Sequence, residues 1–188
     1  MLSDESENEY EETMIPSVFI NHYSTIADKL IKDIPNSQQN PEKYLRNKVQ
    51  QSFFITPINY KEVDDVIDDL KENGNNPHSI ATTVLQSCKH IIIPLLCHLI
   101  NLCVQQGYFP ENLKLGCITP IFKKGDRDKV NNYRPVCSLS PLSKIIEKVI
   151  NNRMVEYLNK FNLFSKSQYG FRKNMGTEDA FLNYIEFS

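Results

Sequence analysis

The chain has 188 residues, of which 40% are hydrophobic and 23% are charged. This mix is ordinary for a globular protein, so it excludes wholesale disorder and allows a sizeable buried core. The length has room for one full-sized domain or a piece of a larger one, and it excludes two complete enzyme domains.

The formal net charge of -2 hides a segregation of charge along the chain. Residues 1–113 contain 8 Lys and Arg against 16 Asp and Glu, whereas residues 114–173 contain 13 against 4. Such a basic block suits a surface that meets phosphate, and it equally suits a solvated basic surface. Charge alone leaves both interpretations open.

The five cysteines are an odd number, and no two of them form a Cys-x-x-Cys pair. We therefore expect buried free thiols in a reduced compartment, and the spacing of Cys and His does not suit zinc. The amino terminus lacks a signal sequence, and the longest apolar run, residues 91–104, is shorter than the roughly 20 residues of a membrane span. The sequence predicts a soluble, intracellular protein with no membrane partner.

Acidic composition and helical spacing predict the first elements of the chain. Residues 1–14 are expected to be an acidic, disordered tail, because residues 1–12 hold six acidic residues and no basic one. From Ile15 to Leu30 apolar residues recur at helical spacing, which predicts a helix that stops before Pro35.

A second helix has clear boundary signals. Asn59 is the expected N-cap, Glu62 stands at the third helical position, and Gly74 follows the expected end. Asp64 and Asp68 stand at i and i+4 on the outer face. They would hold a metal ion or simply form a solvated acidic face, and the absence of apolar pocket sequence favours the solvated face.

Residues 80–106 are apolar nearly all round, which predicts a central buried helix. We expect Pro94 to break or kink this helix, because proline lacks the N–H that an α-helix needs. Gly107 is expected to end it.

Two short apolar runs, residues 115–122 and 133–139, flank a charged loop and predict a β-hairpin. Ser140 and the proline after it then open a helix with regular apolar spacing over about five turns. Arg153 falls inside the apolar arc of this helix, where an unpaired charge is costly, so we expect Glu156 to pair with it.

The hairpin concentrates basic side chains that suit phosphate. Within twelve positions it holds Lys123, Lys124, Arg127, Lys129 and Arg134. An ammonium group is a point counter-charge, and a guanidinium can grip two phosphate oxygens at once. The tip is either a phosphate clamp or an ordinary charged turn on a soluble surface.

A second cluster mixes aromatic and basic side chains after a loop. It consists of Gln168, Tyr169, Gly170, Phe171 and Arg172. Aromatic rings beside Arg suit stacking on bases, and the glycine allows close backbone approach. Alternatively, the two aromatic residues anchor a turn in the core. A last helix is expected from Thr177, with acidic residues in its first turn.

Four strings in the second half of the chain stand in a distinctive order. They are ITPIFKKGD (118–126), NYRPVCSLSPLSKIIEK (132–148), QYGFR (168–172) and GTEDA (176–180). In this order and spacing they closely resemble the fingers segment of the reverse transcriptases of non-LTR (LINE-type) retrotransposons, and four such motifs together are highly specific. Upstream, SFFITP (52–57) and GYFP (107–110) resemble the stretch just before that polymerase.

The resemblance implies an α+β, mainly helical fold: the fingers region of a right-hand polymerase with one basic β-hairpin, its palm and thumb missing. Residues 15–110 would be a helical pre-polymerase and fingers-base region, and residues 111–188 the fingers segment, truncated before the palm. In such polymerases the hairpin closes over the incoming nucleotide. Lys123 or Lys124, together with Arg134, is therefore expected to contact its triphosphate.

The resemblance also implies contacts with a nucleic-acid template. The residues expected to make them are Arg127, Lys129, Gln168, Tyr169, Gly170, Phe171 and Arg172. The implied partners are an RNA template, a DNA primer and a dNTP.

Catalytic aspartates of such polymerases lie in the palm and have no counterpart in these 188 residues. They hold two Mg²⁺ ions that activate the primer hydroxyl and stabilise the leaving pyrophosphate. We therefore expect a fragment of an RNA-directed DNA polymerase that is inactive alone, holds no cofactor or metal of its own, and needs Mg²⁺ only as part of a full-length polymerase. The family's usual Pro-Gly-x-Asp loop is also replaced here, by residues 74–78.

Two other functions remain open at this stage. The basic face would serve a non-enzymatic nucleic-acid-binding module, or the apolar helices would serve a protein-interaction module. A chain that stops before the palm leaves apolar surface uncovered, which favours self-association.

Overall fold

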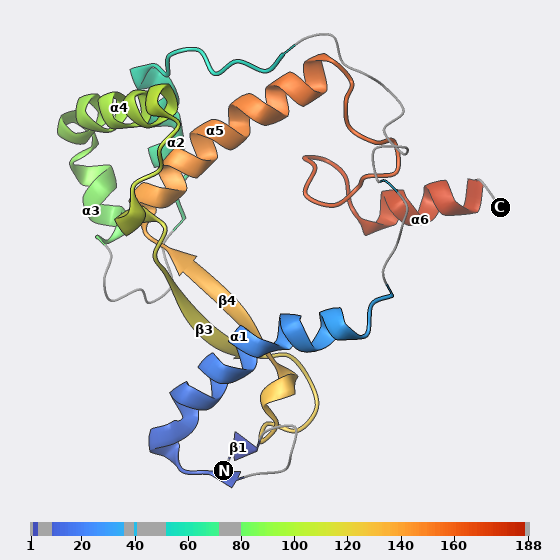
Figure 1. Cartoon of the computed structure of the whole chain (residues 1–188). Helices are drawn as coiled ribbons and strands as arrows, with labels where there is room; N and C mark the ends of the chain where they lie inside the picture. Colours follow the sequence, from blue (N-terminus) through green and yellow to red (C-terminus); the bar gives the residue numbers. More distant parts are fainter. Residues whose placement is uncertain (1, 4–8, 36–39, 41–51, 72–79, 187–188) are drawn as a thin grey trace.

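The computed structural model of the protein describes residues 2–3, 9–35, 40, 52–71 and 80–186 (Figure 1). These residues form a mostly helical α+β fold that contains the two-stranded antiparallel hairpin predicted from the sequence, over residues 116–139. The main elements are α1 (Ile15–Lys32), α2 (Tyr60–Asp68), α3 (Thr82–Ser87), α4 (Lys89–Gln106), β3 (Gly116–Phe122), β4 (Tyr133–Leu139), α5 (Pro141–Lys160) and α6 (Thr177–Glu186). None of the described helices combines the length and the apolar character that a membrane span requires.

The N-terminal region contains short elements before the predicted first helix. Two-residue strands β1 (Leu2–Ser3) and β2 (Glu9–Tyr10) pair in antiparallel fashion, and the short 3-10 helix η1 (Glu12–Met14) leads into α1. These short elements pair backbone groups within the acidic segment, and the prediction of a disordered tail over residues 1–14 stays a prediction. Helix α1 itself begins and ends as predicted.

The main core forms where α2, α4 and α5 pack together. Its fully buried members include Val63 and Ile67 of α2, Ile100 of α4, and Ile145 and Ile146 of α5, all with no exposed surface. Each such aliphatic side chain contributes about 1.5–3 kcal/mol when it leaves water. These three helices lie side by side and form the main structural unit of the described chain (Figure 1).

The N-terminus of α2 has the predicted capping box. Asn59 Oδ1 accepts a hydrogen bond from Glu62 N at 3.0 Å, and Asn59 N donates to Glu62 Oε2 at 2.9 Å. The helix ends at Asp68, earlier than predicted, and Gly74 lies outside the described residues. Acidic side chains are unfavourable near a helix C-terminus, and Asp is a poor helix former, so Asp68 and Asp69 favour this end.

The predicted long helix over residues 80–106 is in fact two helices. The break lies at Cys88, and Pro94 lies inside α4, so of the two effects predicted for Pro94, a break or a kink, the break does not occur. Contacts with α2 determine where the chain turns. Gln86 of α3 donates to the carbonyl oxygens of Ile67 and Leu70 at the end of α2, while α4 packs along α2.

Helix α4 is also not buried all round. Its core-facing residues are Ile93, Leu96, Cys97, Ile100 and Cys103, which are at most 9% exposed. On the other side Ile91 is 63% exposed and Leu95 is 69% exposed. The prediction of a central buried helix is therefore wrong. An apolar helix is buried on all sides only if other elements pack against each side, and in the described part of the chain the core packs against one side of α4.

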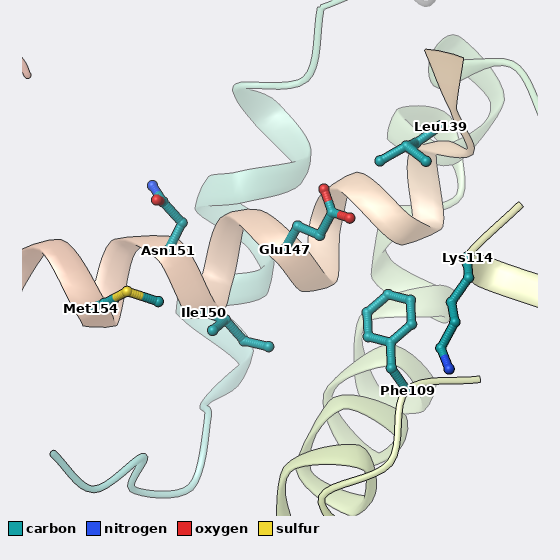
Figure 2. Close-up of a pocket in the computed structure, with 7 residues that line it drawn as sticks. All are labelled: Phe109, Lys114, Leu139, Glu147, Ile150, Asn151 and Met154. Carbon is teal, nitrogen blue, oxygen red and sulfur yellow. The ribbon is translucent and has the colours of Figure 1, made fainter. Parts of the chain in front are cut away.

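A groove runs beside α5, where the connection after α4 approaches it (Figure 2). Its volume is about 460 Å³, and its walls are mostly apolar. The lining residues are Phe109, Lys114, Leu139, Glu147, Ile150, Asn151 and Met154. No residue predicted to bind nucleotide or nucleic acid is among them.

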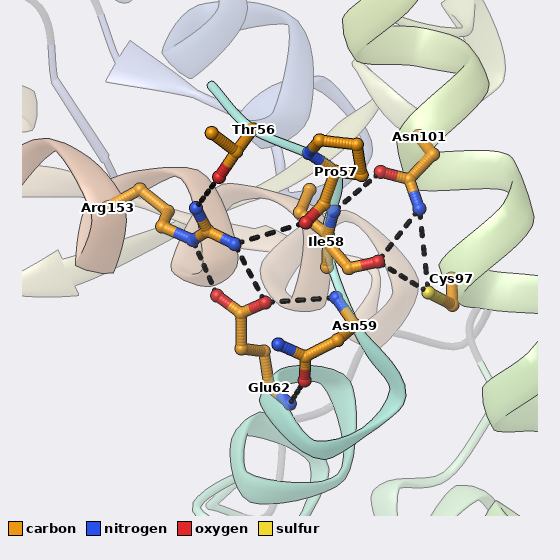
Figure 3. A network of polar contacts seen from close by, with 8 residues as sticks. All are labelled: Thr56, Pro57, Ile58, Asn59, Glu62, Cys97, Asn101 and Arg153. Carbon is orange, nitrogen blue, oxygen red and sulfur yellow. Dashed lines mark hydrogen bonds and ion pairs between the residues drawn. The ribbon is translucent and has the colours of Figure 1, made fainter. Parts of the chain in front are cut away.

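Arg153 of α5 pairs with Glu62 of α2 (Figure 3) and not with the predicted partner Glu156. Its Nε contacts Glu62 Oε1, and its Nη2 donates to Glu62 Oε2 at 2.9 Å and to the Pro57 carbonyl at 3.3 Å. Its Nη1 donates to Thr56 Oγ1. The two charged side chains are 20% and 29% exposed, so the pair is partly shielded from water. Arg153 therefore pairs with a residue 91 positions away in the sequence and not with the nearby Glu156, because the core packs α2 directly against α5.

Residues 56–59, which precede α2 and contact Arg153, also form hydrogen bonds with side chains of α4 (Figure 3). Ile58 N donates to Asn101 Oδ1 at 2.7 Å, and the Ile58 carbonyl accepts from Asn101 Nδ2 at 2.9 Å and from Cys97 Sγ at 3.0 Å. Burial raises the pKa of Cys97, which therefore remains a neutral thiol. We call this network of residues 56–59, Glu62, Asn101 and Arg153 the polar clamp.

Replacing Arg153 by Ala should destabilise the protein and change its acid sensitivity. The hydrogen bonds from Arg153 lower the pKa of Glu62 below its ordinary value of 4.5. The resulting stabilisation is present above that value and is lost as the pH falls through the lowered pKa. We expect R153A to lower the free energy of unfolding by about 1–3 kcal/mol near neutral pH, with a smaller loss in strong acid.

Urea denaturation followed by far-UV circular dichroism at several pH values measures both effects. The matched control is K61A, which removes the exposed pair between Lys61 and Asp65 and should cost about 0.5 kcal/mol or less. Equal effects of the two substitutions would contradict a structural role of the polar clamp.

Candidate nucleic-acid interface

The structure confirms the predicted hairpin, on which five candidate basic residues lie: Lys123, Lys124, Arg127, Lys129 and Arg134. Strands β3 and β4 pair in a register that sets Ile121 opposite Arg134 and Phe122 opposite Tyr133. Because side chains alternate between the faces of a strand, Ile121 and Arg134 share one face, and Phe122 and Tyr133 share the other. The hairpin thus has a face that carries Arg134 and an aromatic face.

Helix α1 packs against the aromatic face and makes a second, smaller core. Phe19 is 7% exposed and Val130 is 1% exposed, and both pack with Tyr133. The ring of Tyr133 lies 5.2 Å from that of Phe19 and 5.6 Å from that of Phe122, with edge-on geometry in both cases. Such aromatic pairs stabilise beyond the area they bury, so α1 supports the hairpin near its tip (Figure 1).

Two side chains shape the loop between the strands: Asn132, which directly precedes β4, and Tyr133, the first residue of β4. Asn132 Nδ2 donates to the Asp126 carbonyl at 2.7 Å, and Tyr133 Oη donates to the Arg127 carbonyl at 2.8 Å. Gly125 has a φ of +90°, and a Cβ at this position would lie 2.7 Å from Asn132 Nδ2. The loop is therefore a defined structure, and it needs glycine at its turn.

Register also separates the two adjacent lysines. Lys123 N donates to the Asn132 carbonyl at 2.8 Å, which extends the strand pairing by one residue. Strand alternation then places Lys123 on the face of Ile121 and Arg134, whereas Lys124 lies in the turn that follows. All three predicted nucleotide-binding side chains are exposed, and within the described part of the chain they form no ion pair.

Two further basic residues of the hairpin are held by neighbours. The guanidinium of Arg127 lies over the ring of Phe122, 5.1 Å from its centre. Lys129 Nζ lies 3.8 Å from Asp126 Oδ2. The structure thus brings all five predicted basic residues onto one hairpin, with Lys123, Lys124 and Arg134 the least constrained.

The second predicted cluster lies in the connection between α5 and α6, apart from the hairpin (Figure 1). Phe171 has a φ of +62° and is fully exposed, so it is not the core anchor that one interpretation of the sequence required. Tyr169 is half-buried, while Gln168 and Gly170 are exposed. Arg172 lies over the ring of Phe164, 4.7 Å from its centre, and contacts the Gln168 carbonyl at 3.5 Å. The chain therefore presents two separate basic and aromatic surfaces.

The acidic pair on α2 binds a lysine. Lys89 Nζ lies 2.7 Å from a carboxylate oxygen of Asp64 and 2.7 Å from one of Asp68. These hydrogen bonds raise the pKa of Lys89. Across the residues that the structure describes, no group of three or more His, Cys, Asp or Glu side chains could hold a metal ion.

The geometry defines a class of protein: a helical base that presents a rigidly supported basic hairpin, an arrangement that suits a phosphate-bearing partner. No protein-family model matches the chain. It is similar to three curated proteins of Drosophila melanogaster: the probable RNA-directed DNA polymerase from transposon BS (26% identical over 85% of this chain), the RNA-directed DNA polymerase from mobile element jockey (27% over 78%) and the probable RNA-directed DNA polymerase from transposon X-element (28% over 79%).

These similarities show that the chain is related to a region of the reverse transcriptases of non-LTR retrotransposons. The chain spans 18%, 16% and 16% of the lengths of the three relatives. The relationship therefore concerns one part of such proteins, and the family resemblance seen in the sequence motifs is confirmed at that level.

Substitution of Gly125 should disturb the loop, whereas substitution of Gly170 should not. We expect G125A to cost about 1–3 kcal/mol of stability, because the new Cβ meets Asn132 at a φ that L-residues rarely adopt. G170A is the matched control, since a Cβ there has no heavy atom within 4 Å. Urea denaturation and hydrogen exchange of the Lys123 amide test this, and equal protection in both variants would contradict the loop structure.

Proposed function

We propose that the chain is the fingers portion of an RNA-directed DNA polymerase of the non-LTR retrotransposon type. In this proposal the face of the hairpin that carries Arg134 contacts the triphosphate of the incoming nucleotide. The observation that carries the proposal is a set of three exposed cations on a supported hairpin, in a chain similar to such polymerases.

The chemistry of the face supports a phosphate partner. Arg134 stands in a strand next to Pro135, so its backbone is fixed and its guanidinium can form two parallel hydrogen bonds to phosphate oxygens. Lys123 shares this face by register and adds a compact positive charge. We therefore propose Lys123 and Arg134 as the main triphosphate contacts, with Lys124 as an auxiliary charge at the turn.

Template contacts are proposed for the two flanking surfaces. Arg127 and Lys129 would meet the sugar-phosphate backbone near the hairpin tip. The exposed ring of Phe171 offers a face for stacking on a base, and stacking of this kind contributes about 1–3 kcal/mol per base. Arg172, held by Phe164, would add charge beside it.

Binding without catalysis is the expected behaviour of these 188 residues. The aspartates that hold Mg²⁺ in such polymerases have no counterpart in the sequence, and Mg²⁺ supplies the main electrostatic support for phosphoryl transfer. The chain's own contribution is to hold and orient nucleotide and template. A non-enzymatic nucleic-acid-binding module is the alternative, and the same exposed cations support it.

Neutralising the hairpin should weaken nucleic-acid binding in a salt-dependent way. If the chain acts as the alternative, a nucleic-acid-binding module, the triple variant K123Q/K124Q/R134Q should reduce the slope of log affinity against log salt by about 2, since each lost phosphate contact on a single strand removes roughly 0.7. Fluorescence anisotropy with a labelled RNA oligonucleotide over a series of KCl concentrations measures the slope.

The matched control for this variant is K32Q/K61Q/K71Q, which removes three exposed lysines outside the hairpin. It changes the net charge equally, so it should shift the affinity but leave most of the slope. An identical loss of slope in both variants would show that net charge, and not the hairpin, attracts the nucleic acid.

Primer extension tests the absence of catalysis. With an annealed RNA template and DNA primer, dNTPs and Mg²⁺, we expect no incorporation by the isolated chain. Binding of the same RNA by anisotropy confirms that the protein is folded and able to bind. Incorporation of even one nucleotide, lost again in K123Q/K124Q/R134Q, would overturn the proposal that these residues bind without catalysing.

A further inference from the structure

Phe19 is the central residue in the contact between α1 and the hairpin. Of the 18 residues of α1, it is the one that is buried. It packs with Val130 and Tyr133 at the end of the hairpin loop, where the 3-10 helix η4 (Val130–Asn132) meets α1. The next residue, Ile20, is 69% exposed. Substitutions at these two neighbouring positions therefore separate the packing contact from the rest of the helix.

Tyr133 connects Phe19 to Arg127. Its ring lies edge-on to the ring of Phe19, with 5.2 Å between the ring centres, and its Oη donates to the Arg127 carbonyl at 2.8 Å. The same ring packs against Phe122 at 5.6 Å, and the guanidinium of Arg127 lies 5.1 Å from the centre of the Phe122 ring. Tyr133 thus fixes the backbone of Arg127 directly and its side chain through Phe122.

The part of the loop that carries Lys129 is attached to α1 as well. Val130, the next residue, is 1% exposed and packs with Phe19. The Lys129 carbonyl accepts a hydrogen bond from Asn132 N at 3.1 Å, which closes the turn around Val130. The backbone positions of Arg127 and Lys129 therefore both depend on packing against α1.

The residues proposed to bind the triphosphate lie on the other face of the hairpin. Arg134 is opposite Ile121 in the register, and alternation places Lys123 on their face. Helix α1 packs against the face that carries Tyr133. The pairing of β3 with β4, and not the contact with α1, therefore holds Arg134 in place.

We propose that Phe19 is a positioning residue that acts through Tyr133 and holds Arg127 where the backbone of a single-stranded RNA meets it. The inference rests on the proposed function, in which Arg127 contacts the template. A phosphate contact on a single strand is worth about fivefold in affinity at 0.1 M salt, so the cost of ordering a loosened loop is enough to cancel it. Phe19, which carries no charge, thus sets part of the salt dependence of RNA binding.

Fluorescence anisotropy with a labelled single-stranded RNA over a series of KCl concentrations tests this role. We expect F19A to lower the affinity about fivefold at 0.1 M KCl and to lower the slope of log affinity against log salt by about 0.7, as R127Q does. I20A is the matched control on the same helix and should change neither quantity. F19L keeps most of the apolar volume and should restore more than half of the lost slope.

Double variants show which residue Phe19 acts through. F19A/R127Q should have the same slope as R127Q alone, whereas F19A/R134Q should show the full loss that F19A causes. Circular dichroism checks that each variant is folded. If F19A does not fold, Y133F decides instead, because it keeps the ring and removes only the hydroxyl that holds the Arg127 carbonyl, and it should lower the slope in the same direction.

The outcomes separate this inference from the function on which it rests. A reduced slope in R127Q with an unchanged slope in F19A, or in Y133F where F19A does not fold, would overturn the role of Phe19 alone. Additive losses of slope in F19A/R127Q would overturn it too, since Phe19 would then act through another residue. An unchanged slope in R127Q itself would contradict the proposed template contact, and this inference with it.

Discussion

The contact between Glu62 and Arg153 connects the parts of this structure. One carboxylate accepts from the N-cap of its own helix and from a guanidinium on α5, so the start of α2 is fixed to the middle of α5. Asn101 fixes the same segment to α4 from the other side. Apolar packing brings these helices together, but it is non-directional. The polar clamp fixes the relative orientation of these helices, because each of its hydrogen bonds has a defined geometry.

The hairpin inherits its position from this arrangement. Strand β4 leads directly into α5 through Ser140, whose side chain accepts from Ser143 N. Ser143 in turn donates to the Leu113 carbonyl, just before β3 begins. Both strands are thereby anchored to the first turn of α5, and α1 supports them near the tip. The exposed side chains of Lys123, Lys124 and Arg134 therefore lie on a hairpin whose position is fixed by the core and the polar clamp.

Local signals in the sequence were sufficient for several elements. The capping box of Asn59 and Glu62, the hairpin, and the start of α5 at Ser140 each depend on residues within a few positions of one another. The partner of Arg153 could not be predicted, because nothing in the local pattern indicates which helix will lie opposite. The position of the helix break at Cys88 could not be predicted for the same reason. Contacts with α2 determine that break, whereas the expectation of a break or kink at Pro94 considered one helix alone. For the site, the sequence identified the basic residues, but the support from Phe19 and the separation of Phe171 from the hairpin are tertiary features.

The packing of Phe19 against Tyr133 couples the N-terminal helix α1 to the hairpin. An isolated two-stranded hairpin is marginally stable in water, so the contact with α1 stabilises the hairpin tip. Coupling free energies are reciprocal. Any ligand that orders the tip must therefore strengthen the attachment of α1 by the same amount. A reporter group on the N-terminal helix would then respond to occupancy of the hairpin without touching the ligand.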